Sequence, residues 1–361
     1  MDYKTTLMWK EISETGRIFN EIAAANEAVM ASAVKAIKAS GATNFVLAGR
    51  GTSDHALMYF KYVLEEKTGY TASYAAPSIV TVFNGKLNYK HSVVVGCSQS
   101  GKAADALAVL EKANREGAVT IAITNDETSP MAKEAKYHLY CNCGPEKSVA
   151  ATKTFSAQLY LSLWLANEIA GDKNETEKLH GYYNCINALF PTISELTDKY
   201  SAKYKNTFSG FVLSRGITYA IANEQTLKLQ ETCYIQMKGY ACSDFYHGPM
   251  AMVNDKTPVL VYCAHNTDAA SSEKLMREDQ EKCIDKMLSL GAPVLVITDD
   301  KYISEKYAEK TDVAYIPADG GDRFSIFSFA LFAQMLACKI SVAIGNNPDA
   351  PRALKKITIT K

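Results

Sequence analysis

Apolar and amphipathic stretches alternate along most of the chain. Short, nearly continuous apolar runs rich in β-branched residues predict strands that are buried on both faces. Those runs are Phe45–Ala48, Val93–Cys97, Val119–Thr124 and Leu139–Cys141. Residues 10–38 have the spacing of a long amphipathic helix, and further helices are predicted from Asp54, Lys102 and Thr152. Strands that alternate with helices in this way predict an α/β fold with parallel sheets.

The alternation occurs twice along the chain. Phe45-Val46-Leu47 is echoed by Phe211-Val212-Leu213, Val93–Val95 by Val259–Val261, and residues 117–126 by residues 291–300. The three echoes keep their order and share an offset of about 170 residues, as a duplicated domain would. Chance likeness among β-rich strands explains three ordered echoes less well than duplication does.

A chain of 361 residues is long enough for two such domains, each with its own core. The expected segments are an N-terminal helical segment (1–40), a first α/β domain (41–175), a helical linker (176–205), a second α/β domain (206–343) and a C-terminal tail (344–361).

The composition of the chain argues against some classes of binding partner. Lys+Arg and Asp+Glu are both 39, and the lack of a dense basic run argues against nucleic acid. The N-terminus does not resemble a signal peptide, and no apolar run is long enough to cross a bilayer. The 9 cysteines are scattered, and no histidine stands at a zinc-like spacing from the one close pair, Cys141 and Cys143. We therefore expect a cytoplasmic protein with reduced thiols, no membrane partner, no metal and no cofactor.

The most suggestive loop follows the predicted strand at Val93–Cys97. It reads Ser98-Gln99-Ser100-Gly101 and leads directly into a predicted helix, as Gly51-Thr52-Ser53 does after the first strand. Hydroxyl groups and free backbone N–H groups at such a turn can hold an anion. Without a lysine clamp, the loop suits a sugar phosphate better than a nucleoside triphosphate. The alternative is that these hydroxyls only cap helices.

Two further groups of residues can carry acid–base chemistry. Glu224, Lys228 and Glu231 fall on one stripe of a predicted helix that follows a strand, so the lysine can hold a carboxylate ionised as a general base. The alternative is a solvated salt-bridge face. His247 stands in a loop before Gly248-Pro249, where a rigid turn could position it for proton transfer.

The chain resembles the double-SIS phosphosugar family, which includes the isomerase half of glucosamine-6-phosphate synthase and type II glucosamine-6-phosphate deaminases. The resemblance spans nearly the whole chain in the family order. It rests on the motifs Arg50–Ala56, Ser98–Gly101, Pro145–Lys153, Leu227–Thr232 and His247–Pro249, and on Asn347–Arg352 leading to Lys356. It implies two SIS domains, each a parallel flavodoxin-like sheet flanked by helices.

The resemblance also implies a role for each matched residue. Glu231 moves a proton between C1 and C2 of the sugar, His247 assists ring opening, and Lys356 closes over the substrate. Glu224 and Lys228 orient Glu231, and Glu146 has a supporting role. The residues that bind phosphate and sugar are Thr52, Ser53, Ser98, Gln99, Ser100 and Val149. His247 reaches in from the partner subunit, so a homodimer with a shared active site is expected.

The sequence departs from the synthase pattern at two positions. Ala103 and Ala151 stand where that enzyme has hydroxyl residues that touch phosphate and sugar, although Ala151 agrees with the deaminase-like motif. Gln230, where the family often has lysine, is expected to face solvent.

The predicted reaction is conversion of glucosamine 6-phosphate to fructose 6-phosphate and ammonia. We expect the deaminating direction because no amidotransferase segment precedes the sugar domains in this sequence. A galactosamine substrate stays open, as does release of an amino acid from a phosphorylated Amadori sugar. A non-catalytic phosphosugar sensor is the alternative from another class.

Overall fold

The computed structural model describes residues 1–266 and 270–356, and residues 270–272 are described by their backbone alone. The last five positions of the predicted tail lie outside the described residues. The chain forms two compact bodies. The first-sheet body comprises Glu14–Lys147, Ala151–Tyr183 and the described residues from Leu354 on, and the second-sheet body comprises Met1–Ser13, Ser148–Ala150 and Asn184–Ala353.

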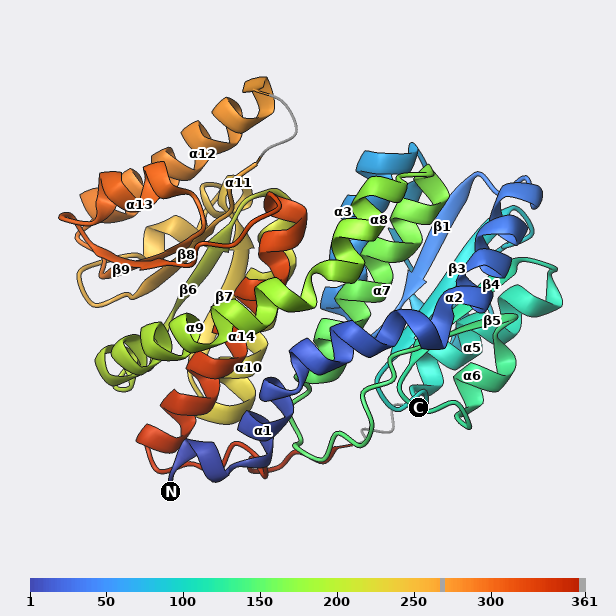
Figure 1. The fold of residues 1–361 in the computed structure, drawn as a ribbon, viewed down its shortest axis with the longest axis horizontal. Helices are drawn as coiled ribbons and strands as arrows, with labels where there is room; N and C mark the ends of the chain where they lie inside the picture. Colours follow the sequence, from blue (N-terminus) through green and yellow to red (C-terminus); the bar gives the residue numbers. More distant parts are fainter. Residues whose placement is uncertain (267–269, 357–361) are drawn as a thin grey trace. The chain divides into compact units, whose positions relative to one another are not determined.

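The first-sheet body has five parallel strands in the order β2-β1-β3-β4-β5 (Figure 1). Its strands are β1 (Asn44–Ala48), β2 (Thr71–Tyr74), β3 (Ser92–Ser98), β4 (Val119–Thr124) and β5 (Tyr137–Tyr140). Its helices are α2 (Thr15–Ala39), α3 (Thr52–Thr68), α4 (Pro77–Thr81), α5 (Ala104–Arg115), α6 (Pro130–Glu134), α7 (Lys153–Ala170) and α8 (Lys173–Gly181).

The second-sheet body repeats this plan, with its strands in the order β10-β9-β8-β6-β7, all parallel. Its strands are β6 (Ser209–Ser214), β7 (Gln236–Ala241), β8 (Val259–Cys263), β9 (Val294–Thr298) and β10 (Asp312–Tyr315). Its α-helices are α1 (Leu7–Ser13), α9 (Tyr183–Tyr204), α10 (Tyr219–Cys233), α11 (Cys242–Phe245), α12 (Ala270–Ser289), α13 (Lys301–Tyr307) and α14 (Asp322–Ala343). Short 3₁₀ turns lie at Tyr3–Thr5, Gly216–Thr218 and Pro249–Met252.

Both sheets have the flavodoxin-like order 2-1-3-4-5 when each is numbered from its own first strand. The predicted α/β class and the internal duplication are therefore confirmed. The Phe-Val-Leu echo, however, is off by one residue. Phe45 packs against Phe60 of α3, the helix that follows its strand, with ring centroids 5.9 Å apart. Phe211 instead packs against Phe245 of α11, on the face of its sheet that is opposite to α10, the helix that follows its strand. Because side chains alternate between the faces of a strand, a shift of one residue reverses every contact.

Alternate strand residues form a core on each face of a sheet. In the first-sheet body, Val46 and Val94 pack against α5, including Val109 and Leu110. In the second-sheet body, Val259 and Val261 pack against the α12 side, and Tyr262 on the opposite face meets Phe329 of α14 at 5.3 Å between ring centroids.

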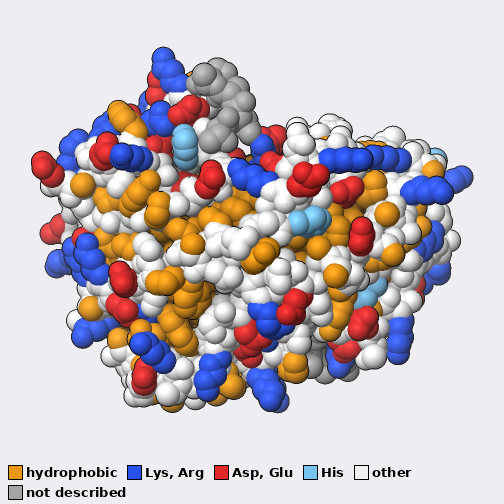
Figure 2. Space-filling model, viewed as in Figure 1, with side chains coloured by type: hydrophobic (Ala, Val, Ile, Leu, Met, Phe, Trp, Pro, Cys, Tyr) orange, Lys and Arg blue, Asp and Glu red, His pale blue; other side chains and the backbone are white. Residues whose placement is uncertain are grey.

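Helix α14 corrects one expectation from the sequence. By length and composition it could cross a bilayer, but 89% of its most apolar window is buried inside the structure, as in the core helix of a folded domain. On the face of the molecule seen in Figure 2, acidic and basic side chains are interspersed, in keeping with the balanced composition.

Candidate functional site

The serine loop of the first-sheet body (Ser98–Gly101) is fixed by its main chain. The Gly101 N–H donates to the Ser98 carbonyl at 3.2 Å, and the Asn125 N–H, just past β4, donates to the Gln99 carbonyl at 3.0 Å. Ser98 is buried, whereas Gln99 and Ser100 are half-buried. These main-chain bonds fix the loop so that Gln99 and Ser100 lie beyond the carboxyl end of β3, the edge at which parallel sheets bind ligands.

Gly101 is the residue that makes this turn possible. Its φ is +61°, which favours glycine, and a Cβ at this position would overlap the Ser129 hydroxyl. The predicted helix from Lys102 actually begins at Ala104. Its N-cap is Ala103, which makes no side-chain hydrogen bond to the first turn. The N–H groups of that turn are left to other acceptors, such as water or an anion.

The loop after β1 lies beside the serine loop in the sheet order. Helix α3 begins at Thr52, and its N-cap Gly51 has no side chain. The predicted hydroxyl groups thus do not occupy the N-cap position of either α3 or α5. Ser53 is buried, and its hydroxyl accepts a hydrogen bond from Gln158 Nε2 at 3.1 Å. Burial raises the pKa of Asp54, which follows it, against the opposing charges of His55 and Arg50.

Arg50 joins the two loops, a contact that sequence reasoning missed. Its guanidinium donates to Asp105 Oδ2 through Nε at 3.0 Å and through Nη2 at 2.7 Å. Asp105 lies in the first turn of α5, a favourable place for a carboxylate. The motif that contains Arg50 could not reveal its pairing with Asp105, because the two residues are 55 positions apart in the chain.

Glu146 and Lys356 also meet within the first-sheet body. Lys356 Nζ lies 2.8 Å from Glu146 Oε2, and the fully buried Glu146 also accepts the N–H groups of Thr152 and Thr154 at 3.0 and 3.1 Å. Burial alone would raise the pKa of Glu146, but Lys356 and these hydrogen bonds outweigh it and lower the pKa. Glu146, predicted to have a supporting role, is thus an ionised carboxylate that binds Lys356, the lysine predicted to close over the substrate.

The second-sheet body contains the acid–base stripe of α10. Lys228 is fully buried, with its Nζ 3.4 Å from Glu224 Oε1 and 2.7 Å from Glu231 Oε2. Glu224 is also fully buried, whereas the Glu231 side chain is 23% exposed. Burial opposes the charge of Lys228, but the two carboxylates outweigh it and raise its pKa. The solvated-face alternative is therefore wrong, and Glu231 is the end of the network that can reach a substrate.

His247 lies in the turn after α11 and is exposed. It lines a pocket of about 260 Å³ with Arg215, Cys242, Ser243, Tyr246, Asp279 and Lys282. Within it, Arg215 Nε lies 3.2 Å from Asp279 Oδ2. Glu231 is not among the described residues that line this pocket, so the structure does not bring His247 and Glu231 together in that pocket.

Val149 is engaged by the tail of the second-sheet body. Its N–H donates to the Asp349 carbonyl at 3.3 Å, and the Asp349 carboxylate accepts the N–H groups of Leu7 and Met8, each at 2.8 Å. This cap joins the two ends of the described chain, and the spacing of the sequence gives no sign of it. Among the described residues, no group of three or more His, Cys, Asp or Glu side chains could hold a metal ion.

Comparison with known proteins places part of this chain in a known family. Residues 40–167 match the SIS domain family. A glutamine–fructose-6-phosphate aminotransferase (isomerizing) of Sulfolobus acidocaldarius is 30% identical over 324 residues, which cover 90% of this chain and 51% of the relative. The chain thus spans about half the length of the curated relatives it matches.

Solved structures share the fold. The C-terminal domain of glucosamine-fructose-6-phosphate aminotransferase from Francisella tularensis superposes with a TM-score of 0.82 at 23% identity, over 96% of this chain and 98% of that one. Glucosamine-6-phosphate deaminase from Thermotoga maritima gives a TM-score of 0.75 at 21% identity, over 98% and 100%. Residues 40–167 of this chain belong to the SIS domain family, and the aligned relatives and the second sheet of the same order extend the likeness over the rest of the chain.

Proposed function

We propose that this chain is a phosphosugar isomerase that deaminates glucosamine 6-phosphate to fructose 6-phosphate. The observation that carries the proposal is the buried Glu224–Lys228–Glu231 network, which holds one partly exposed carboxylate beside a buried cation. A carboxylate that is oriented by a cation and still reaches the surface suits a general base. The serine loop, with its rigid main chain and uncapped helix start, supports phosphate binding.

In the proposed reaction, Glu231 takes the proton from C2 of the open-chain aminosugar and returns it to C1. The enaminol formed by the first transfer becomes a C2 imine after the second. Water then adds to C2 and ammonia leaves, so one substrate and one water give fructose 6-phosphate and ammonia. Lys228 orients Glu231 before the first transfer, and Glu224 balances the buried lysine. We propose the deaminating direction because it needs no co-substrate except water.

The remaining predicted residues have roles in the same proposal. Thr52, Ser98, Gln99 and Ser100 bind the phosphate and sugar hydroxyls, while the buried Ser53 supports the loop through Gln158. Lys356, held by Glu146, closes over the bound sugar. His247 opens the sugar ring as an acid–base group and belongs to the partner subunit of a dimer.

The test is to measure ammonia and fructose 6-phosphate released from glucosamine 6-phosphate by the purified chain without glutamine. Equal amounts of both are expected. Glu231→Gln should lower kcat by about 10²–10⁴-fold, since that is the usual contribution of a general base. Glu305→Gln, the same chemical change at an exposed position of α13, is the matched control and should be unaffected.

Two results would contradict the proposal. Turnover that survives in Glu231→Gln removes Glu231 as the base. No turnover of glucosamine 6-phosphate by the parent chain overturns the substrate. The same assay with galactosamine 6-phosphate and phosphorylated Amadori compounds then identifies the other aminosugar or a deglycase, and sugar-phosphate binding without any turnover identifies a sensor.

A further inference from the structure

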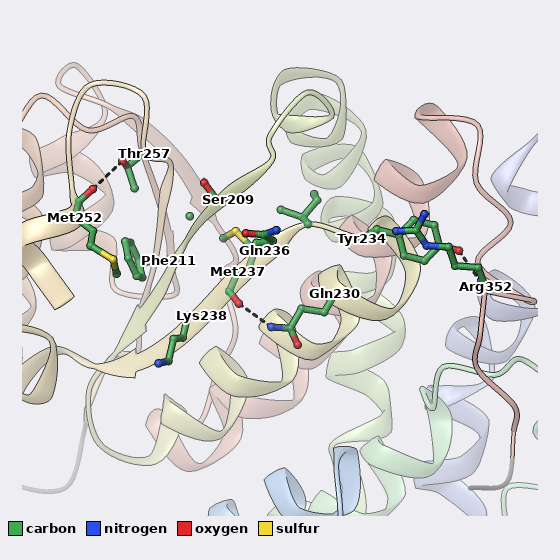
Figure 3. Close-up of a pocket in the computed structure, with 12 residues that line it drawn as sticks. Ser209, Phe211, Gln230, Tyr234, Gln236, Met237, Lys238, Met252, Thr257 and Arg352 are labelled. Atoms are coloured by element: carbon green, nitrogen blue, oxygen red, sulfur yellow. Dashed lines mark hydrogen bonds between the residues drawn. The ribbon is translucent and has the colours of Figure 1, made fainter.

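A second pocket lies at the opposite edge of the second sheet from His247. It has a volume of about 640 Å³, within the range of small-molecule sites, and it opens where β6 and β7 begin (Figure 3). It is lined by Ser209, Gly210, Phe211, Gln230, Tyr234, Ile235, Gln236, Met237, Lys238, Met252, Thr257 and Arg352. None of the residues proposed to touch the substrate lines this pocket, so the proposed reaction leaves it without a role.

The charge of the lining is positive. It contains Arg352 and Lys238 and no carboxylate from any described residue. Both cations are exposed, and neither forms an ion pair with a carboxylate in the described part of the chain. The Arg352 guanidinium lies 4.2 Å from the centre of the Tyr234 ring, which leaves its planar edge for an anion. A guanidinium in this setting favours phosphate, which it can bind through two parallel hydrogen bonds.

The rest of the lining suits a ring that carries hydroxyl groups. Gln230, Gln236, Ser209 and Thr257 supply amides and hydroxyls, each able to donate and to accept hydrogen bonds. Gln230, exposed as the sequence predicted, donates from Nε2 to the Met237 carbonyl at 2.7 Å, which fixes its amide between the two ends of the pocket in Figure 3. The exposed side chain of Met252 adds an apolar wall that can pack against the face of a sugar.

Tyr234 connects the pocket to the proposed catalytic helix. It ends α10 with φ +60° and ψ +29°, a left-handed conformation that is unusual for a bulky residue and stores strain. The Tyr234 hydroxyl accepts the Arg352 N–H at 2.8 Å. Glu231 lies three residues earlier, on the last turn of the same helix. A ligand that draws Arg352 away from Tyr234 would therefore change the end of the helix that carries Glu231.

We propose that this pocket is a second binding site for a phosphorylated sugar, distinct from the serine loop. Its phosphate binds Arg352 and Lys238, its ring lies among the glutamines and against the apolar wall, and its occupancy changes the turnover step at Glu231. The binding statement does not depend on the proposed function, whereas the effect on turnover rests on it.

Binding is tested with glucose 6-phosphate as the probe, by calorimetry on a Ser98→Ala/Ser100→Ala variant that disables the serine loop. Saturable binding to one site is expected. Adding Arg352→Gln and Lys238→Gln should weaken it by about tenfold or more for each lost charge-assisted contact. Adding Lys301→Gln, which removes an exposed charge from α13, should leave it unchanged. Unphosphorylated glucose should bind at least about tenfold more weakly than glucose 6-phosphate.

Several results would overturn the binding proposal. One is that the serine-loop variant does not bind glucose 6-phosphate. Another is that its affinity is unchanged after Arg352→Gln and Lys238→Gln. A third is that glucose and glucose 6-phosphate bind with equal affinity. Tighter binding of AMP than of glucose 6-phosphate would overturn the sugar assignment.

The effect on turnover is read from kcat and KM of the chain with its serine loop intact. Competition at the serine loop raises KM alone, so a change in kcat with glucose 6-phosphate reports the second site. That change should disappear in Arg352→Gln/Lys238→Gln, in which kcat with the probe and kcat without it should be equal. A kcat unaffected by the probe, in a chain that turns over its substrate and binds the probe, overturns the coupling.

Discussion

Lys228 shows at the scale of one residue how the proposed function constrains the fold. A buried lysine is tolerated only because two carboxylates flank it. Removing one member of a buried charge network leaves its partner unpaired, which is more costly than never having had the pair. The residues proposed to orient Glu231 are thus also needed for stability.

Lys228→Met should lower the free energy of unfolding by about 3–5 kcal/mol, since it leaves the fully buried Glu224 without its cation. Urea denaturation measures this change. The Glu224→Gln/Lys228→Met double variant should recover part of the loss, because it also removes the buried carboxylate that has lost its cation. Lys301→Met, at an exposed position, should change stability by no more than about 0.5 kcal/mol. A double variant that is less stable than the single one would show that the charges are not the cause.

Asp299 gives a prediction about pH. It follows β9 and is buried, with Oδ1 accepting the His265 N–H at 2.8 Å and Oδ2 accepting the Ser325 hydroxyl. Burial raises its pKa to about 6, against these hydrogen bonds. The folded state thus holds this proton more tightly than the unfolded state does. Its contribution to stability is complete below about pH 4 and is lost as the pH rises through about 6, a change of about 3 kcal/mol.

The measurement is the difference in unfolding free energy between the parent chain and Asp299→Asn at pH 4, 5, 6 and 7. The parent should lose stability relative to the variant over this range. A difference that is constant with pH, or that changes in the opposite direction, would contradict the assignment.

At the scale of helices and strands, the apolar pattern predicted what lies in the middle of each sheet. Val93–Cys97 and Val119–Thr124 fall within β3 and β4, since strands covered on both faces must be apolar throughout. The pattern missed β2, β7 and β10, which lie at sheet edges and contain polar residues such as Lys238. It also placed the start of α5 too early, because the turn at Gly101 depends on Ser129, a residue distant in sequence.

Gly101→Ala should destabilise the first-sheet body by about 2–3 kcal/mol. It adds left-handed strain and displaces Ser129, whose hydroxyl accepts the Ala132 N–H as the N-cap of α6. Gly117→Ala is the matched control, since its φ is +84° but no described atom lies within 4 Å of the added Cβ. It should cost about 1 kcal/mol. Equal losses in thermal or urea unfolding would show that Ser129 has no part in the effect.

At the scale of the whole molecule, the duplicated plan was predictable from ordered echoes, and so was the clustering of Glu224, Lys228 and Glu231 on one helix. The pairs Arg50–Asp105 and Glu146–Lys356 were not, because each joins residues far apart in the chain. Apolar periodicity reports which face of an element is buried, and it carries no information on which polar side chains then meet.

The proposed shared active site can be tested with mixed subunits. Glu231→Gln and His247→Asn should each be inactive alone. If each site takes these residues from different subunits, a re-equilibrated equal mixture should regain about a quarter of parental activity, since half of the dimers are mixed and each has one intact site. Ammonia release measures it. If a mixture shown to contain mixed dimers regains no activity, then Glu231 and His247 of each site come from the same subunit.

The Asp349 cap on α1 has a consequence for protein synthesis. The cap and the Leu7 N–H that it binds are 342 residues apart, and a ribosome adds about 5–20 residues per second. The first helix therefore leaves the exit tunnel on the order of tens of seconds before its cap exists. During that interval Met8 and Ile12, buried in the finished protein, have no core to enter. The α1 segment is thus a natural target for a ribosome-associated chaperone until Asp349 has been synthesised.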